Sequence, residues 1–192
     1  MSTKFLSAAT LLALAATPAA AHLDPAAHGS FAAGLSHPMF GLDHVLAMIA
    51  VGLWAVLLGG RALVAVPTAF VATMIAGFGL SLAGVSLPLM EPVIVASVVV
   101  FGLVVATAFR LPVAAGATLV AVFALFHGNA HGSELGVATP WGFLAGFAIG
   151  TMGLHAVGLA AGIGLARLDL DRVTRGVGAA LALSGLGIAF AG

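Results

Sequence analysis

The sequence predicts an all-α integral membrane protein, a bundle of about six transmembrane helices. Of its 192 residues, 62% are hydrophobic and only 6% are charged, whereas a soluble domain carries about 25% charged residues. Glycine and proline, rather than charges, interrupt the long apolar runs, as membrane helices tolerate. The connections between these runs are too short for a soluble domain, so the chain is one compact domain in a lipid bilayer.

The first 21 residues are typical of a cleavable signal peptide, which leaves residues 22–192 as the membrane domain. Lys4 supplies a positive charge, residues 5–17 form a short apolar stretch, and residues 18–21 end in an A-x-A cleavage pattern. An uncleaved additional helix is the alternative, although the stretch is short for a full span. A secretory signal places the mature N-terminus outside the cytoplasm.

Six apolar stretches after residue 21 approach the roughly 20 residues that are needed to cross about 30 Å of hydrocarbon. They are Phe31–Leu58, Ala62–Val85, Pro92–Phe109, Pro112–Gly128, Pro140–Ala166 and Val173–Ala191. Gly146, Gly150, Gly158 and Gly162 repeat at four-residue spacing in the fifth stretch, which predicts close helix packing there.

The distribution of basic residues gives the orientation independently of the signal peptide. With the N-terminus outside, the inner connections follow the first, third and fifth helices. Every basic residue after position 21 then lies on the inner side: Arg61, Arg110, Arg167, Arg172 and Arg175. This arrangement obeys the positive-inside rule. A net charge of zero gives no indication of a nucleic-acid partner, and the absence of cysteine excludes thiolate chemistry.

A cluster of candidate metal ligands opens the first helix, in the segment His37-Pro38-Met39-Phe40-Gly41-Leu42-Asp43-His44. His37 and His44 differ by seven residues, two helical turns, so both imidazoles can face one way. Asp43 is a direct ligand or a partner that orients a histidine. A carboxylate and an imidazole in lipid need a partner or an ion. A hydrogen-bonded structural pair or a helix cap is the alternative.

A second cluster closes the fourth helix, in His127-Gly128-Asn129-Ala130-His131-Gly132-Ser133-Glu134. Spacings of four and three place His127, His131 and Glu134 on one stripe if the helix persists. Alternatively, the glycines open the chain so that carbonyls line a cavity, or the segment is a wet loop. Imidazole and carboxylate ligands suit Ni²⁺, Co²⁺ or Zn²⁺ better than Mg²⁺ or Ca²⁺.

Two further residues are candidates for handling the metal because of where they lie in the predicted helices. Glu91 lies at the outer start of the third helix, where it is a metal ligand, a favourable charge at a helix N-terminus, or both. His155 lies midway along the fifth helix and is a deeper relay for the ion or an interhelical hydrogen-bonding residue. We expect His22, Asp24 and His28 in a solvated tail.

The chain resembles the HupE/UreJ family, through the signal-like N-terminus, His37-Pro38 with Gly41-x-Asp43-His44-x-x-Ala47-Met48, and His127-Gly-x-Ala-His131-Gly-x-Glu134. The resemblance covers essentially the whole chain. It implies a six-helix protein of the bacterial inner membrane with a periplasmic N-terminus, linked to nickel supply for hydrogenase or urease maturation, in some members to cobalt. It also implies metal-handling roles for His37, Asp43, His44, His131 and Glu134.

The function that follows is a secondary permease for a divalent metal, nickel first and cobalt second. The ion would be cargo, and no permanent cofactor and no enzymatic activity are expected. No phosphate-binding loop occurs in the sequence, so ATP could drive transport only through a partner. An intramembrane metal-dependent hydrolase is one alternative, although Gly128 stands where the HExxH motif has glutamate. A metal-sensing or assembly subunit is the other.

Overall fold

The computed structural model describes residues 25–191, and the predicted signal peptide lies outside them. The described residues form helices and connecting turns, with no strand among them. The helices are α2 (Pro25–His28), α3 (Ser30–Ser36), the 3₁₀ helix η1 (His37–Met39), α4 (Leu42–Leu58), α5 (Ala62–Leu82), α6 (Met90–Ala106), α7 (Val113–Ser133), α8 (Pro140–Arg167) and α9 (Asp171–Ala191). The protein is therefore an all-α membrane bundle.

Four of these helices, α5, α7, α8 and α9, are long and apolar enough to cross a bilayer. The pair Ser30–Met39 and Leu42–Leu58 adds a fifth span if it is counted as one. Helix α6 is apolar but has 17 residues, at the lower end of the range of about 17–25 residues for spanning helices.

The first predicted helix, Phe31–Leu58, is not continuous. It bends by 77° between Met39 and Leu42. Pro38 lacks a backbone N–H and Gly41 adopts an extended conformation before α4 begins, so the helical hydrogen bonds are interrupted here. The prediction that His37 and His44 lie two turns apart on one helix is therefore wrong, because the bend separates them.

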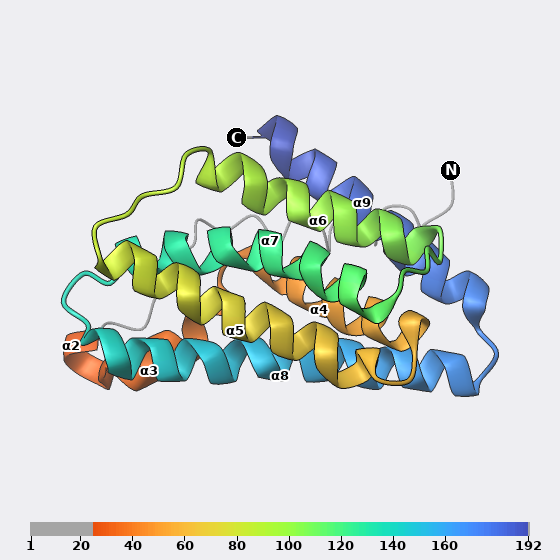
Figure 1. Ribbon diagram of the computed structural model, residues 1–192, viewed down its shortest axis with the longest axis horizontal. Helices are drawn as coiled ribbons and strands as arrows, with labels where there is room; N and C mark the ends of the chain where they lie inside the picture. The colour runs from red at the N-terminus through yellow and green to blue at the C-terminus, as the bar shows by residue number, and fades with distance from the viewer. Residues whose placement is uncertain (1–24, 192) are drawn as a thin grey trace, which may run out of the picture.

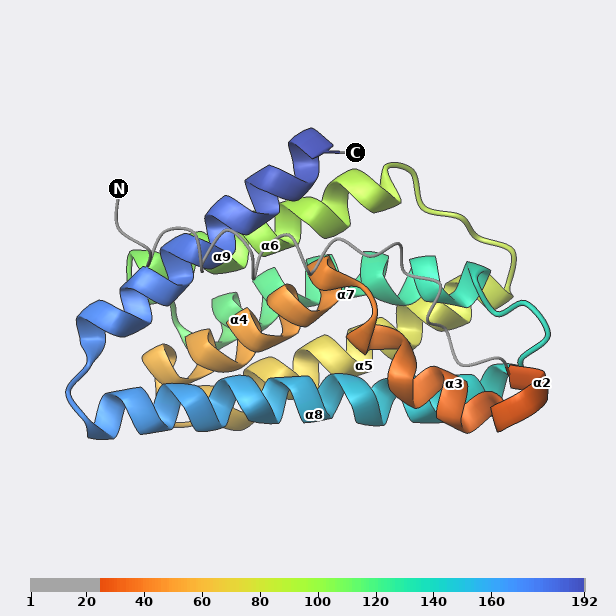
Figure 2. The ribbon, with the colours of Figure 1, turned by 180° about the vertical axis from the view of Figure 1, so that it is seen from behind.

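The helices lie lengthwise in an elongated bundle (Figures 1 and 2). Helix α8 runs along one edge, α6 and α9 run along the opposite edge, and α4, α5 and α7 lie between them. The short helix α3 packs on the N-terminal part of α8. All the arginines lie in or beside the connections at one end of the bundle, those that join α4 to α5, α6 to α7 and α8 to α9.

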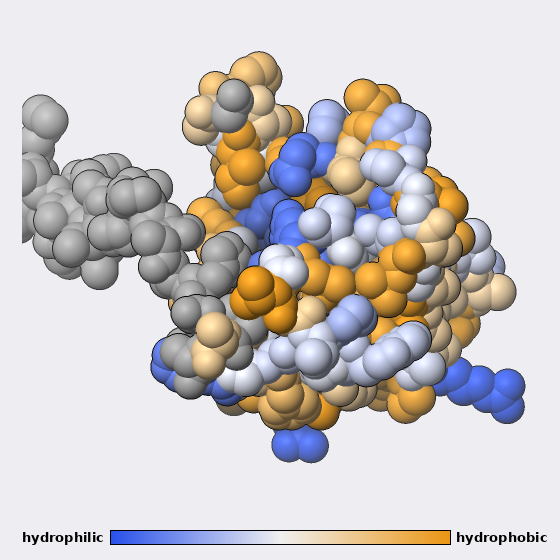
Figure 3. Space-filling view, turned by 90° about the vertical axis from the view of Figure 1, so that its left-hand side faces the viewer, coloured by the Kyte–Doolittle hydropathy of each residue, from blue (hydrophilic) through white to orange (hydrophobic). Residues whose placement is uncertain are grey.

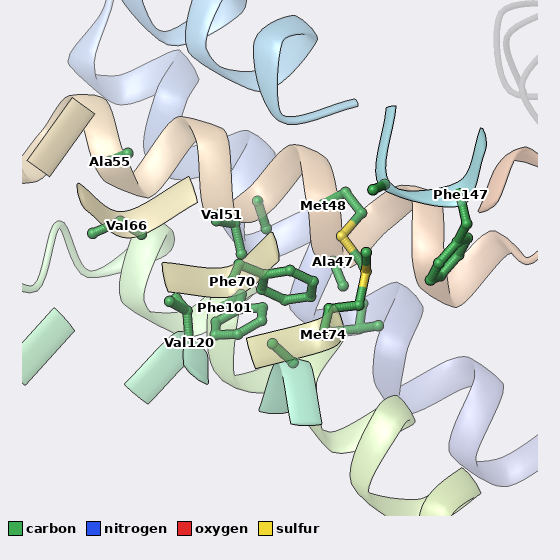
Figure 4. Close-up of a cluster of buried hydrophobic side chains, with 14 of the residues drawn as sticks. Ala47, Met48, Val51, Ala55, Val66, Phe70, Met74, Phe101, Val120 and Phe147 are labelled. Carbon is green, nitrogen blue, oxygen red and sulfur yellow. The ribbon is translucent and has the colours of Figure 1, made fainter. Parts of the chain in front are cut away.

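A hydrophobic core joins the central helices (Figure 4). It includes Met48 of α4, Phe70 and Met74 of α5, Phe101 of α6 and Phe147 of α8, all of them fully buried. Such burial gives no hydrophobic driving force between helices within lipid, so close packing of side chains holds these helices together.

Close backbone contact explains several glycines. Gly146 of α8 faces the backbone of α3, and Gly158 faces the backbone of α4 at Ile49. A methyl group at either position would overlap main-chain atoms, which cannot yield as side chains do. The prediction that the glycine repeat in α8 serves helix packing is confirmed at these positions.

Candidate metal centre

Three potential ligands meet at the end of the bundle opposite the arginines. His37 Nε2 lies 2.8 Å from His131 Nδ1 and 3.2 Å from Glu134 Oε2, and His131 Nδ1 lies 3.0 Å from the same oxygen. These three atoms form a nearly equilateral triangle of two imidazoles and one carboxylate. Among the described residues this trio alone was found grouped closely enough to hold a metal ion.

A fourth imidazole joins the trio through His131. His44 Nε2 lies 2.6 Å from His131 Nε2, so His131 has one nitrogen toward the triangle and the other toward His44. The far nitrogen of His44, Nδ1, lies 2.9 Å from Asp43 Oδ1. Asp43 thus orients His44, one of the two roles that the sequence allowed for it.

The turn between η1 and α4 positions these groups. A Cβ atom on Gly41 would lie 2.8 Å from both Asp43 Oδ1 and His44 Nδ1. Only glycine leaves room here for the bond between Asp43 and His44. The bend also lets His37 approach His131 from α3's side of the bundle, where its ring contacts Phe143 of α8 at 5.1 Å between centroids.

Helix α7 persists through the second cluster, beyond the predicted end at Gly128. Its regular turns place Glu134, the C-cap residue, three positions after His131. Gly128 and Gly132 do not open the chain. Instead they face Met74 and Ser81 of the neighbouring helix α5, and side chains there would collide with it. Of the alternatives that the sequence left open, the structure has the persistent helix, which continues to Ser133.

When its imidazoles are neutral, the triangle holds at most one proton between its three ligand atoms. Asp43 can only accept, so a neutral His44 carries its proton on Nδ1 and offers a lone pair at Nε2. A neutral His131 must then donate from Nε2, which leaves its Nδ1 as a lone pair beside the Glu134 carboxylate at 3.0 Å. These two acceptors can share only the Nε2 proton of His37, which lies 2.8 Å from His131 Nδ1 and 3.2 Å from Glu134 Oε2, and a further proton or a metal ion would also be stabilised between them.

Glu134 supplies the negative charge at this position. Its side chain is 48% exposed at the mouth of the site. With a proton on His131 Nδ1, hydrogen bonds from the ring nitrogens of His131 and, second, of His37 hold the pKa of the Glu134 carboxyl well below its usual range. The carboxylate is therefore ionised throughout the pH range in which histidines titrate.

A small cavity opens beside the cluster. Its volume is about 250 Å³. It is lined by His37, Phe40, Gly41, Asp43, His44, Glu91, His131 and Glu134. In Figure 3, which views this end of the molecule, hydrophilic surface lies in a hollow between hydrophobic residues. Glu91 lies in the first turn of α6 and is exposed, so it belongs to the cavity wall rather than to the triangle.

His127 does not lie at the mouth as the sequence predicted. It is 0% exposed, one turn deeper in α7, with its ring 4.7 Å from that of His44. Its Nε2 lies 3.0 Å from Ser97 Oγ of α6. His155 is also buried, and its Nδ1 lies 2.9 Å from the carbonyl oxygen of Met48. His127 thus extends the line of imidazoles one turn inward, and both His127 and His155 contact the ring of Phe70.

Sequence reasoning missed Asn129, which fixes the loop in front of α6. Its side-chain amide donates to the carbonyls of Gly77 and Val85, and its oxygen accepts from the N–H of Leu87. A buried asparagine within an apolar helix was the available signal, because such a group needs partners. Asn129 thereby holds the loop that leads to Glu91 against α7.

Comparison with known proteins identifies the family of the chain. The HupE / UreJ protein family matches residues 10–188. The chain belongs to the HupE/UreJ family. Protein HupE of Rhizobium leguminosarum bv. viciae is 43% identical over 188 residues, which cover 95% of this chain and 96% of the relative. No solved structure matches the HupE/UreJ chain described here.

Proposed function

We propose that this protein is a secondary permease that takes up a divalent transition-metal ion, Ni²⁺ first and Co²⁺ second. The triangle of His37 Nε2, His131 Nδ1 and Glu134 Oε2 carries the proposal. At bonds of about 2.1 Å, adjacent ligands of an octahedral ion lie about 3.0 Å apart, and the triangle's edges are 2.8–3.2 Å. The ion would be cargo and not a permanent cofactor.

The choice of metal rests on the ligands and the family. Two imidazoles and a carboxylate favour borderline ions over Mg²⁺ and Ca²⁺, which prefer oxygen ligands. Among these ions, the resemblance to the HupE/UreJ family favours nickel first and cobalt second. It also implies a link to hydrogenase or urease maturation. His44, with Asp43 behind it, would receive the ion from the triangle, and Glu91 would attract cations to the cavity.

The ligand cluster and the arginines lie at opposite ends of the bundle, which supports an orientation in the bacterial inner membrane. The arginine end would face the cytoplasm, and the ligand cluster the periplasm. Reporter fusions after Arg61, Arg110 and Arg172 should be cytoplasmic, and fusions near Leu89 and Ser133 periplasmic. A cytoplasmic reporter at Ser133 would contradict both the orientation and periplasmic capture.

Uptake into sealed vesicles that contain only this protein tests the transport itself. We expect Ni²⁺ to enter faster than into protein-free vesicles, and a His37→Ala variant of equal abundance to match the protein-free rate. Metal binding without uptake would instead support a metal-sensing or assembly subunit. Uptake that His37→Ala leaves unchanged would separate transport from the triangle.

A further inference from the structure

Two deeply buried imidazoles share an unusual feature, a ring nitrogen without a hydrogen-bond partner among residues 25–191. The atoms are His127 Nδ1 and His155 Nε2. The two side chains are 0% and 1% exposed. Buried polar groups normally have partners, so each such exception requires an explanation.

The hydrogen bonds on the other side of each ring determine where the protons lie. The carbonyl oxygen of Met48 can only accept, so His155 carries its proton on Nδ1. Ser97 uses its single hydroxyl hydrogen on the carbonyl of Ile94, at 2.6 Å, and must accept from His127 Nε2. Both unpartnered nitrogens therefore carry lone pairs.

A lone pair at one nitrogen and an anchored N–H at the other is the arrangement of a metal-binding histidine. The two rings flank the same aromatic side chain, Phe70, at centroid distances of 5.5 Å for His127 and 5.0 Å for His155. His127 in turn contacts His44, which joins this pair to the mouth.

We propose that His127 Nδ1 and His155 Nε2 form an inner station that binds the transported ion after it leaves the mouth. The inference rests on the proposed function and adds a second binding position to it. The partners of the two rings are a hydroxyl and a carbonyl, with no carboxylate. Such a station would bind more weakly than the mouth and release the ion inward, as conduction requires.

Two substitutions remove the unpartnered nitrogens while keeping the anchoring hydrogen bonds. His155→Asn retains an N–H near the position of Nδ1, and His127→Gln retains one near Nε2. The matched control is His28→Ala, which removes an exposed histidine in α2. A His37→Ala/Glu134→Gln double variant, the mouth variant, removes two of the three ligands of the triangle. Thermal melting in detergent would show that each variant is folded.

Equilibrium dialysis of the purified full chain against Ni²⁺ measures how many ions each chain binds. We expect two bound Ni²⁺ ions per chain for the wild type and for His28→Ala. We expect one bound ion per chain for His155→Asn, for His127→Gln and for the mouth variant. In vesicles, the inner variants should lower the maximal uptake rate at least tenfold and leave the half-saturating Ni²⁺ concentration unchanged.

One equivalent in the wild type, retained by folded inner variants that also transport at the wild-type rate, would overturn the inner station. It would leave the proposed function intact. That outcome would mean that the two lone pairs accept protons or water only. Absence of uptake by the wild type, by contrast, would contradict the proposed function itself, whatever the number of bound ions.

Discussion

The histidines at the mouth and those in the interior differ in the groups behind them. At the mouth, His44 contacts the carboxylate of Asp43 and His131 contacts that of Glu134. In the interior, His127 donates to a serine hydroxyl and His155 to a backbone carbonyl. The same side chain is therefore placed beside negative charge in one region and beside neutral dipoles in the other. If the protein carries a dication as proposed, this difference predicts strong capture at the mouth and weak retention deeper in the bundle.

Among residues that support the ligands, the largest effect should come from removing the charge behind His44. Asp43→Asn keeps size and hydrogen bonding but no longer offsets the charge of a dication. We expect Ni²⁺ uptake to fall about 100-fold, the upper range for loss of a partner that orients a ligand. Uptake of radioactive nickel into vesicles, at matched protein abundance, measures it.

Asp169→Asn is the control for Asp43→Asn, because this carboxylate lies at the arginine end and should not affect capture. Full uptake by the Asp43→Asn protein would contradict the distinction between a charged mouth and a neutral interior. His44→Ala should be as severe as Asp43→Asn, since the two residues act as one unit.

A smaller loss should follow from crowding the turn at the mouth. Gly41→Ala would push a methyl group against the contact between Asp43 and His44. We expect Ni²⁺ affinity to fall about tenfold, the lower range for a displaced orienting partner. Calorimetric titration of the purified protein measures it. Gly153→Ala is the matched control, because open space surrounds this helical glycine, and equal losses in the two variants would contradict a specific role for Gly41.

Acidity should weaken capture by about tenfold for each pH unit per proton displaced. Protons and a metal ion compete for the same imidazole nitrogens, so capture should weaken as the pH falls. Glu134 stays ionised in the pH interval to be measured, because its pKa lies well below the usual range, and the loss should follow the histidines alone. Affinity measured from pH 8 to pH 5.5 that stays constant would contradict imidazole ligation.

The smallest effect should come from Ser97, which supports an interior histidine. Ser97→Ala removes the acceptor that fixes the proton of His127, a neutral hydrogen bond worth about 1 kcal/mol. We expect the maximal uptake rate to fall about fivefold, with capture at the mouth unchanged. Thr118→Ala, which removes an exposed hydroxyl bonded to its own helix, is the control. A loss as large as that of Asp43→Asn would remove the contrast between the two regions.

The sequence predicted the bundle and part of the site, because both depend on local spacing. Six apolar stretches correspond to the observed helical segments, and the separation of three between His131 and Glu134 places them together on α7. Spacing could not reveal the bend at Gly41, where a loop conformation replaces a helical turn. It also could not give the depth of His127, which depends on how α7 packs against α4 and α6. The tautomers of His127 and His155 could not be predicted either, because the groups that fix them, the hydroxyl of Ser97 and the carbonyl of Met48, come from other helices.

Because of the bend in the first span, the distances between the ligand atoms depend on how separate helices pack together. His37 is carried by α3 and η1, which rest on α8 through backbone contact between Gly34 and Phe143. The other two corners of the triangle are carried by α7. A displacement of one support relative to the other would separate the ligand atoms and lower the affinity for an ion. Substitutions at Gly146, which packs against the backbone of α3 away from the triangle, should therefore change metal affinity.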